Sequence, residues 1–111
     1  MFKEVQISQY RNNGAKIFTG RDKGIKARDE LDLNNLDEQN ETVKVLIPSD
    51  TWGINPSFFG GMFEGSIKTL GSKFTEKYQF EYSNGNELNE SMKRDISDNI
   101  EFVIRNISVA Q

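Results

Sequence analysis

The stretch from residue 43 to residue 71 constrains the fold more than any other, because it specifies a strand, a short connecting segment and a helix. Residues 43–48, VKVLIP, are rich in β-branched and aliphatic side chains, which is typical of a central strand covered on both faces. Asn55 and Pro56 then supply a helix cap and a first helical residue. Gly71 supplies the positive-φ residue on which helices end, so both ends of this helix are predicted.

Two further patterns complete the second half of the chain. Tyr78, Phe80 and Tyr82 alternate with polar residues, which is typical of a half-buried strand. From near Asn86 onward, apolar residues recur every three or four positions, which predicts a long C-terminal helix. The apolar stripe of this helix comprises Leu88, Met92, Ile96, Ile100, Val103, Ile104 and Ile107.

The N-terminal part of the chain predicts shorter elements. Alternating apolar residues indicate a strand over 2–7, and the Asn-Asn-Gly cluster at 12–14 indicates a turn. Residues 15–18 form a second predicted strand, which we expect to pair with the first as an antiparallel hairpin. Helical spacing predicts a helix over 21–32, and the acidic, Asn-rich segment 32–41 is expected to be a surface loop.

The predicted elements follow one another in the order β-β-α-β-α-β-α. Strands separated by helices need crossover connections, so part of the sheet must be parallel, whereas the first hairpin adds an antiparallel edge. A chain of 111 residues has the usual size of one domain. We therefore expect an α/β fold in which residues 1–111 form a single domain, with a small mixed sheet of about four strands and about three helices.

The composition argues against most enzyme mechanisms and metal sites. Cys and His are both absent, which removes thiol and imidazole chemistry, disulfides and the common zinc and haem ligands. No spacing links a Ser, Tyr or Lys nucleophile with a general base, and no cofactor motif is present. We therefore expect a protein that is not an enzyme and that has no cofactor or metal.

Charge and hydropathy narrow the class of partner. The formal net charge of −3 gives no overall electrostatic support for nonspecific binding to nucleic acid or to anionic membranes. The longest aliphatic run, residues 45–47, is far shorter than the roughly 20 residues of a spanning helix. The first residues also lack the apolar core of a secretory signal. We expect a cytoplasmic protein without a membrane span, and we do not expect nucleic acid as a partner.

The segment between the strand at 43–48 and the following helix is the first candidate site, because α/β folds place function at the carboxyl ends of strands. Ser57 is either a helix cap in place of Asn55 or a serine that is phosphorylated or contacts a ligand. Trp52 is either a lid over the core or a platform for a ligand. The sequence alone leaves both pairs of interpretations open.

The aromatic start of the helix predicted from Pro56 to Leu70 also allows two interpretations. Phe58, Phe59, Met62 and Phe63 exceed what a narrow core stripe requires. They form either a wide buried face under the sheet or a partly exposed docking patch.

The basic segment of the first predicted helix is a candidate anion site. Arg21, Lys23, Lys26 and Arg28 lie on this helix or at its start, and Arg21 and Arg28 share one face because they are seven residues apart. Glycines beside a helix N-terminus with basic side chains are able to hold a phosphate, although neither a P-loop nor a dinucleotide motif is present. The alternative is an ordinary solvated helix face.

Three segments together carry a family resemblance. They are TGRDKGIKAR at 19–28, VLIP at 45–48 and INPSFFGGMF at 54–63, and in this order they resemble the bacterial STAS-like domain family of uncharacterised function, which is related in fold to the anti-anti-sigma factors. The resemblance covers residues 18–82. It implies a small α/β domain that acts by contact with proteins and is often encoded beside, or fused to, a histidine-kinase-like ATPase.

The resemblance also bears on Ser57. In the anti-anti-sigma factors a serine at this helix start is phosphorylated by a partner kinase, and Ser57 is the matching position. Asn55 stands where that pattern has an acid, and Phe58 stands where it has Gly. The resemblance therefore carries over the surface and not the phosphorylation chemistry.

The leading expectation is a non-enzymatic regulatory module that binds a protein partner through residues 52–63. The partner that the resemblance implies is a histidine-kinase-like ATPase. Two alternatives remain. One is a small nucleotide- or phosphate-binding domain that uses the basic segment, and the other is a phage-type inhibitor of a bacterial defence protein.

Overall fold

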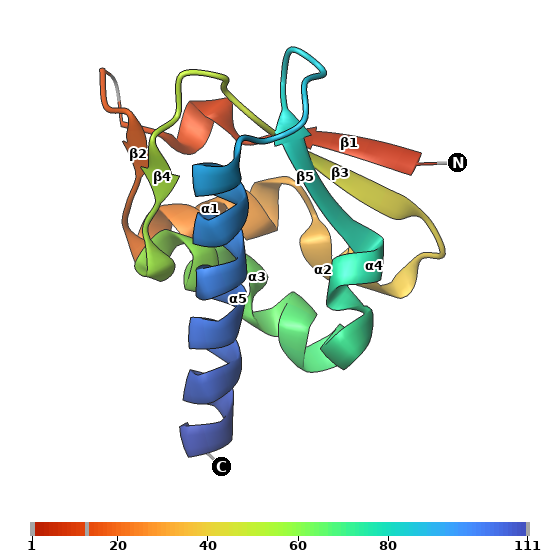
Figure 1. Ribbon diagram of the computed structural model, residues 1–111. Helices are drawn as coiled ribbons and strands as arrows, with labels where there is room; N and C mark the ends of the chain where they lie inside the picture. The colour runs from red at the N-terminus through yellow and green to blue at the C-terminus, as the bar shows by residue number, and fades with distance from the viewer. Residues whose placement is uncertain (1, 13, 111) are drawn as a thin grey trace.

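The computed structural model describes residues 2–12 and 14–110, with side chains as far as residue 107. Its strands form a three-stranded sheet in the order β1-β3-β5 and a separate two-stranded ribbon of β2 and β4 (Figure 1). The strands are β1 (Phe2–Gln6), β2 (Ile17–Phe18), β3 (Thr42–Ile47), β4 (Gly53–Ile54) and β5 (Tyr78–Tyr82). The strands predicted at 43–48 and from Tyr78 to Tyr82 are therefore confirmed.

Helices account for most of the rest of the described chain. They are α1 (Arg21–Glu30), α2 (Leu33–Glu38), α3 (Pro56–Leu70), α4 (Phe74–Lys77) and α5 (Glu90–Ala110), with the short 3₁₀ helices η1 (Ser8–Tyr10) and η2 (Gly71–Lys73). The α/β class is confirmed, but α2, β4 and α4 add to the predicted order, and the strands lie in two sheets. Among the described residues, no helix has the length and hydropathy needed to cross a membrane.

The predicted antiparallel hairpin at the N-terminus is wrong. β1 pairs with β3 and β2 pairs with β4, and every strand pair in the described part of the chain is parallel, so the expected mixed sheet is corrected as well. The link between β1 and β2 is not a tight turn, because η1 anchors it in the core. Tyr10 is buried there, and its hydroxyl donates to Glu30 Oε1 at 2.8 Å. Of the predicted turn at 12–14, Asn13 lies outside the described residues.

The predicted surface loop at 32–41 is also wrong in part, because it contains α2. Asp32 takes a left-handed conformation, with φ of 58°, and this ends α1 and turns the chain into the new helix. Leu33 and Leu36 are three residues apart and are both buried, so they anchor one face of α2 in the core. Asn35 and Glu38 are exposed on its outer face, whereas Asp37 is buried.

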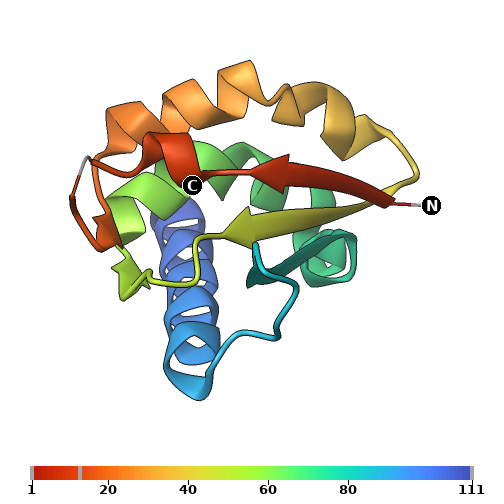
Figure 2. The ribbon, with the colours of Figure 1, turned by 90° about the horizontal axis from the view of Figure 1, so that it is seen from above.

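β3 is the central strand, as predicted, but helices cover only one face of its sheet. Val43, Val45 and Ile47 are fully buried on that face. The other face is open in Figure 2, where β1 and β3 lie in front of the helices. On this open face Lys44 is half-buried, with its Nζ 4.3 Å from the centroid of the Phe2 ring and 3.9 Å from Glu81 Oε2. Leu46 alternates onto the same face as Lys44 and is only 6% exposed, so this face is covered in part without a second layer of helices.

α3 has both of the ends that the sequence predicted. The Asn55 side chain accepts a hydrogen bond from the Ser57 backbone N–H at 2.9 Å, and Pro56 is the first helical residue. Gly71 ends the helix with φ of 58°.

α1 and α3 cross at unusually short range. An ideal Cβ on Gly24 would lie 2.2 Å from the Phe58 carbonyl oxygen, and one on Gly61 would lie 2.3 Å from the Arg21 carbonyl oxygen. Only glycine fits at these two positions, so the two backbones pack directly against each other.

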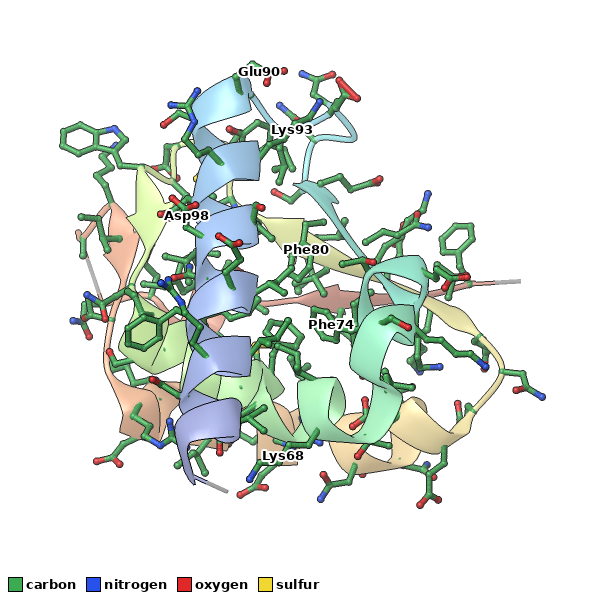
Figure 3. The ribbon with its side chains drawn as sticks, turned by 60° about the horizontal axis from the view of Figure 1, so that its bottom comes forward. Lys68, Phe74, Phe80, Glu90, Lys93 and Asp98 are labelled. Carbon is green, nitrogen blue, oxygen red and sulfur yellow. The ribbon has the colours of Figure 1, made fainter. Side chains whose placement is uncertain are left out.

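α5 begins at Glu90, later than the predicted start near Asn86. A turn closes first, in which the Tyr82 N–H donates to the Asn86 carbonyl oxygen at 3.0 Å. Asn89 then caps the helix, since its Oδ1 accepts from the Met92 N–H at 2.8 Å. Figure 3 shows Glu90 at the start of α5, with buried Phe74 and half-buried Phe80 between α5 and α4. The last turns of α5 extend beyond the rest of the molecule in Figure 1.

The helix crossing predicts a pair of contrasting variants. Gly61→Ala is expected to lower the free energy of unfolding by about 1–3 kcal/mol, because its methyl group would overlap the α1 backbone. Gly60→Ala is the matched control, since its Cβ would meet mainly the flexible end of the Arg21 side chain, at 3.2 Å. Urea unfolding measures both, and equal loss of stability in the two variants would contradict the crossing.

Candidate functional site

The β2–β4 ribbon brings the starts of α1 and α3 together. Each of its parallel strands leads into a helix after a short link, so Gly20 and Asn55 lie at the same end of the ribbon. The Ser57 hydroxyl donates to Asn55 Oδ1 at 2.7 Å and accepts from the Gly20 N–H at 3.4 Å. Asn55 is thus the helix cap, and exposed Ser57 joins the two helix starts.

Trp52 lies at the other end of β4 and is the most exposed large apolar side chain among the described residues. Its side chain is 74% exposed, so the prediction of a lid over the core is wrong. The core beneath the ribbon is already filled by Phe18 and Ile54, which are buried. Ile17, on the adjacent strand, is 41% exposed. Ile17 pairs with Gly53, the residue after Trp52, and we use the name ribbon surface for the exposed side chains of Ile17 and Trp52 at this end of the ribbon.

Polar contacts fix the loop that carries Trp52. The Trp52 N–H donates to the Lys16 carbonyl oxygen at 2.7 Å. Arg11 Nη1 donates to Asp50 Oδ1 at 2.7 Å and to Thr51 Oγ1 at 3.0 Å. Hydrogen bonding from Arg11 lowers the pKa of Asp50 to about 2, and Lys16 contributes to the same shift. These contacts therefore fix the loop that carries Trp52.

The three phenylalanines of α3 belong to the core. Phe58, Phe59 and Phe63 are each no more than 2% exposed, which contradicts their prediction as exposed contacts for a partner. Phe63 lies 4.9 Å from Phe59 and 5.6 Å from Phe74, measured between ring centroids. α3 is surrounded by α1, α5 and the sheet, so its wide apolar face is a buried one.

The structure does not assemble the predicted anion site. Arg21 Nη2 lies 3.5 Å from Glu64 Oε1, and Lys26 is exposed to solvent. Lys23 is half-buried, and Arg28 is turned into the protein interior. Arg21 and Arg28 do share the face toward α3, as their spacing predicted, but Arg28 is committed to other groups.

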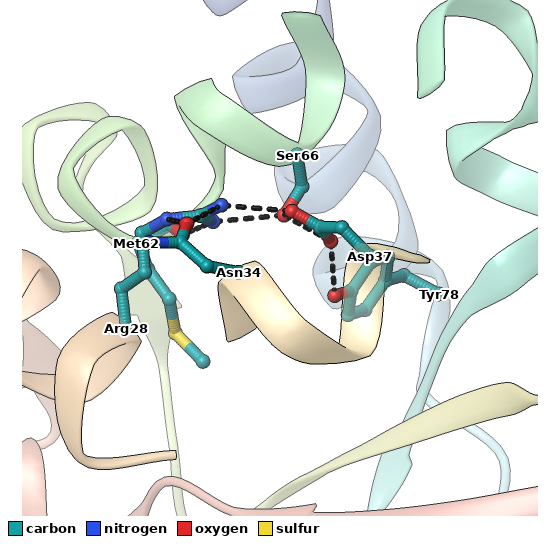
Figure 4. A network of polar contacts seen from close by, with 6 residues as sticks. All are labelled: Arg28, Asn34, Asp37, Met62, Ser66 and Tyr78. Carbon is teal, nitrogen blue, oxygen red and sulfur yellow. Dashed lines mark hydrogen bonds and ion pairs between the residues drawn. The ribbon is translucent and has the colours of Figure 1, made fainter. Parts of the chain in front are cut away.

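Arg28 belongs to a buried polar network that the sequence did not reveal (Figure 4). Its guanidinium donates to Asp37 Oδ2, Ser66 Oγ and the Met62 carbonyl oxygen, each at 2.8 Å, and it also bonds Asn34 Oδ1. We call Arg28, Asn34, Asp37, Ser66 and Tyr78 the polar network. It joins α1, α2, α3 and β5.

Asp37 is the centre of the polar network. Its carboxylate accepts hydrogen bonds from Arg28, Ser66 and Tyr78, and its residue is only 7% exposed. Burial and the bond to Asp37 raise the pKa of Tyr78 well above its usual range. Ser66 is completely buried, so its hydroxyl is not open to a substrate. The apolar spacing of Leu33 and Leu36 beside Asp37 was the one sequence signal that α2 faces the core.

α5 contributes a further contact that the sequence did not reveal. Asp95 Oδ2 accepts from the Ile54 N–H at 2.7 Å, and Asn99 Nδ2 donates to the Ile54 carbonyl oxygen at 2.8 Å. These two side chains are one helical turn apart and satisfy the outer edge of β4. The ribbon is thereby fixed to the body of the protein.

Removal of the Arg28 side chain tests the polar network. Arg28→Met is expected to lower the free energy of unfolding by about 3–5 kcal/mol, because it leaves the Asp37 carboxylate buried without its cation. Lys26→Met on the exposed side of the same helix is the control and should change stability by less than about 0.5 kcal/mol. Chemical unfolding followed by circular dichroism would refute the network if the two variants were equally stable.

The Asp50 contacts give a prediction for pH. Because the folded pKa of Asp50 is about 2 and the ordinary value is 3.8, these contacts stabilise the loop above pH 3.8 and are lost as the pH falls toward 2. Arg11→Ala should raise the pKa of Asp50 toward 3.8, whereas Lys3→Ala on β1 should leave it unchanged. An NMR titration of the Asp50 carboxyl carbon measures both, and an unshifted pKa in Arg11→Ala would contradict this assignment.

Comparison with known proteins was made on the whole chain. No model of a protein family matches it, and no curated protein and no solved structure matches it either. The local geometry is therefore what bears on function.

Proposed function

We propose that this protein is a non-enzymatic regulatory module that binds another protein through the ribbon surface. The observation that carries the proposal is the 74% exposure of Trp52 on a loop that is already fixed. Trp is enriched among the few residues that carry most of the energy of a protein interface. An anchor that is ordered beforehand also loses little conformational entropy on binding.

The neighbours of Trp52 support a binding surface of mixed character. Ile17 adds a second exposed apolar side chain on the adjacent strand. Arg11 and Lys16 both pair with the carboxylate of Asp50, so these three side chains together carry one positive charge in excess, and the Asp95 carboxylate lies on the opposite edge of the ribbon, at Ile54. A partner with an apolar contact flanked by acidic residues suits this arrangement.

The surroundings of Ser57 favour a regulatory role over a catalytic one. Its hydroxyl donates to the amide oxygen of Asn55, which does not take up a proton as a general base does. Ser57 is exposed at the second position of α3, where a phosphate would gain from the helix dipole. Phosphorylation there would break the bond to Asn55 and add negative charge between the two helix starts.

The partner class follows from the resemblance of residues 18–82 to the STAS-like family. It is a histidine-kinase-like ATPase, whereas the role of Ser57 as the residue through which binding is regulated rests on its exposed position at the start of α3. The phosphate-binding alternative is weakened because Arg28 already bonds Asp37 and Ser66. Inhibition of a bacterial defence protein would use the same ribbon surface and would differ in the identity of the partner.

Affinity capture from a lysate of the native host tests the proposal. Trp52→Ala should reduce recovery of the partner at least about tenfold, as expected for an interface anchor. Phe2→Ala is the matched control, because Phe2 is 51% exposed on the open face of the other sheet and should keep the partner. Mass spectrometry identifies the captured protein, and circular dichroism checks that each variant folds.

Ser57 variants in the same experiment test regulation. Ser57→Asp should weaken capture and Ser57→Ala should retain it. Equal recovery with these two variants would remove the regulatory part of the proposal. Equal recovery with wild type and Trp52→Ala would remove the ribbon surface as the binding site.

A further inference from the structure

The two edges of the β2–β4 ribbon differ in how their backbone groups are satisfied. The carbonyl oxygens of Lys16 and Phe18 accept from N–H groups of the β4 segment, those of Trp52 and Asn55, at 2.7 and 2.8 Å. Alternate residues of a strand direct their backbone groups to opposite sides. Ile17, between Lys16 and Phe18, therefore directs its N–H and carbonyl oxygen away from β4.

Ile54 occupies the equivalent outward position on β4, and there α5 takes the place of a third strand. Asp95 accepts the Ile54 N–H and Asn99 donates to the Ile54 carbonyl oxygen. A neighbouring strand would offer the same pair of groups, one acceptor and one donor. The side chains of Asp95 and Asn99 therefore satisfy this edge of the ribbon as a third strand would.

The opposite edge, at Ile17, is open. Within the described part of the chain, the Ile17 N–H and carbonyl oxygen make no hydrogen bond on the outer side of β2. Its side chain is 41% exposed, and β2 lies at the margin of the molecule in Figures 1 and 2. Edges that proteins protect from pairing commonly carry charges, as β1 does with Lys3 and Glu4, whereas the outward residue of β2 is apolar.

We propose that an extended segment of a partner protein adds to the edge of β2, pairs with Ile17 and contacts Trp52. This inference rests on the proposed binding function and names the form of the partner. An extended backbone supplies the donor and the acceptor that Ile17 lacks, as α5 supplies them to Ile54. An apolar residue of the segment packs on Ile17, and an acidic neighbour faces the excess positive charge of Arg11 and Lys16.

The probe for this proposal is a library of random 12-residue peptides displayed on phage and selected against the full chain. A selected peptide is synthesised, and its affinity is measured by fluorescence polarisation. Each residue of the peptide is then N-methylated in turn, which removes one N–H without changing the side chain. Pairing with the outward groups of Ile17 predicts a loss of about tenfold where the one N–H that bonds the Ile17 carbonyl oxygen is methylated, and little change at the two flanking residues. A helical binding mode gives losses at several successive residues instead.

Hydrogen exchange of the protein supplies an independent readout. The Ile17 amide should exchange about tenfold more slowly in the saturated complex, because it gains a partner. The Ile54 amide is the internal control, since Asp95 already holds it in the free protein. A loss confined to one N–H of the peptide, together with protection of Ile17, supports the proposal.

The remaining outcomes overturn it in distinguishable ways. A peptide that needs Trp52 but shows neither the loss at a single N–H nor protection of Ile17 removes strand addition and leaves the proposed function standing. Failure to select any peptide also removes strand addition, and capture with Trp52→Ala then decides the proposed function separately. A dimer by light scattering that protects Ile17 without peptide assigns the edge to a second copy of this chain and equally overturns the proposal.

Discussion

The buried ion pair between Arg28 and Asp37 is the interaction on which the rest of the structure depends. A charge in the interior is tolerated only where it is paired and its other hydrogen bonds are satisfied. Ser66 and Tyr78 supply those bonds to Asp37, so α1, α2, α3 and β5 must all be in place together. Such a requirement favours one arrangement of the elements over other compact ones, which apolar contacts alone discriminate poorly.

The close crossing of α1 and α3 at Gly24 and Gly61 makes the Arg28–Asp37 ion pair geometrically possible. Because Gly24 and Gly61 let the two backbones touch, Arg28 is brought close enough to bond both the Met62 carbonyl oxygen and Ser66. The same approach sets β2 beside β4, since each strand leads into one of these helices. The position of Trp52 at the surface is thus tied to packing in the interior.

Elements with local signals were predictable and elements that depend on distant partners were not. α3 was found because Asn55, Pro56 and Gly71 mark its ends within the segment itself. The burial of Asp37 depends on Arg28 and Tyr78, whose contacts with it are not visible in the local sequence. The acidic composition of residues 32–41 therefore predicts a loop where the structure has α2. The prediction that β1 pairs with residues 15–18 was wrong for the same reason. Alternation of apolar residues identifies a strand but not the strand beside it, which is β3. The exposure of Trp52 likewise depends on Phe18 and Ile54 having already filled the space beneath the ribbon.

The attachment of α5 to β4 has a consequence for the order in which the protein is made. On the ribosome β2 and β4 emerge well before Asp95 and Asn99, so a nascent chain has a ribbon with both edges unpaired. Until α5 is synthesised, Ile17 and Ile54 both present backbone groups able to pair with other unfinished chains. Once α5 has formed, the ribbon has one unpaired edge instead of two, so ribosome-bound chaperones meet a molecule that is more prone to aggregation than the folded protein.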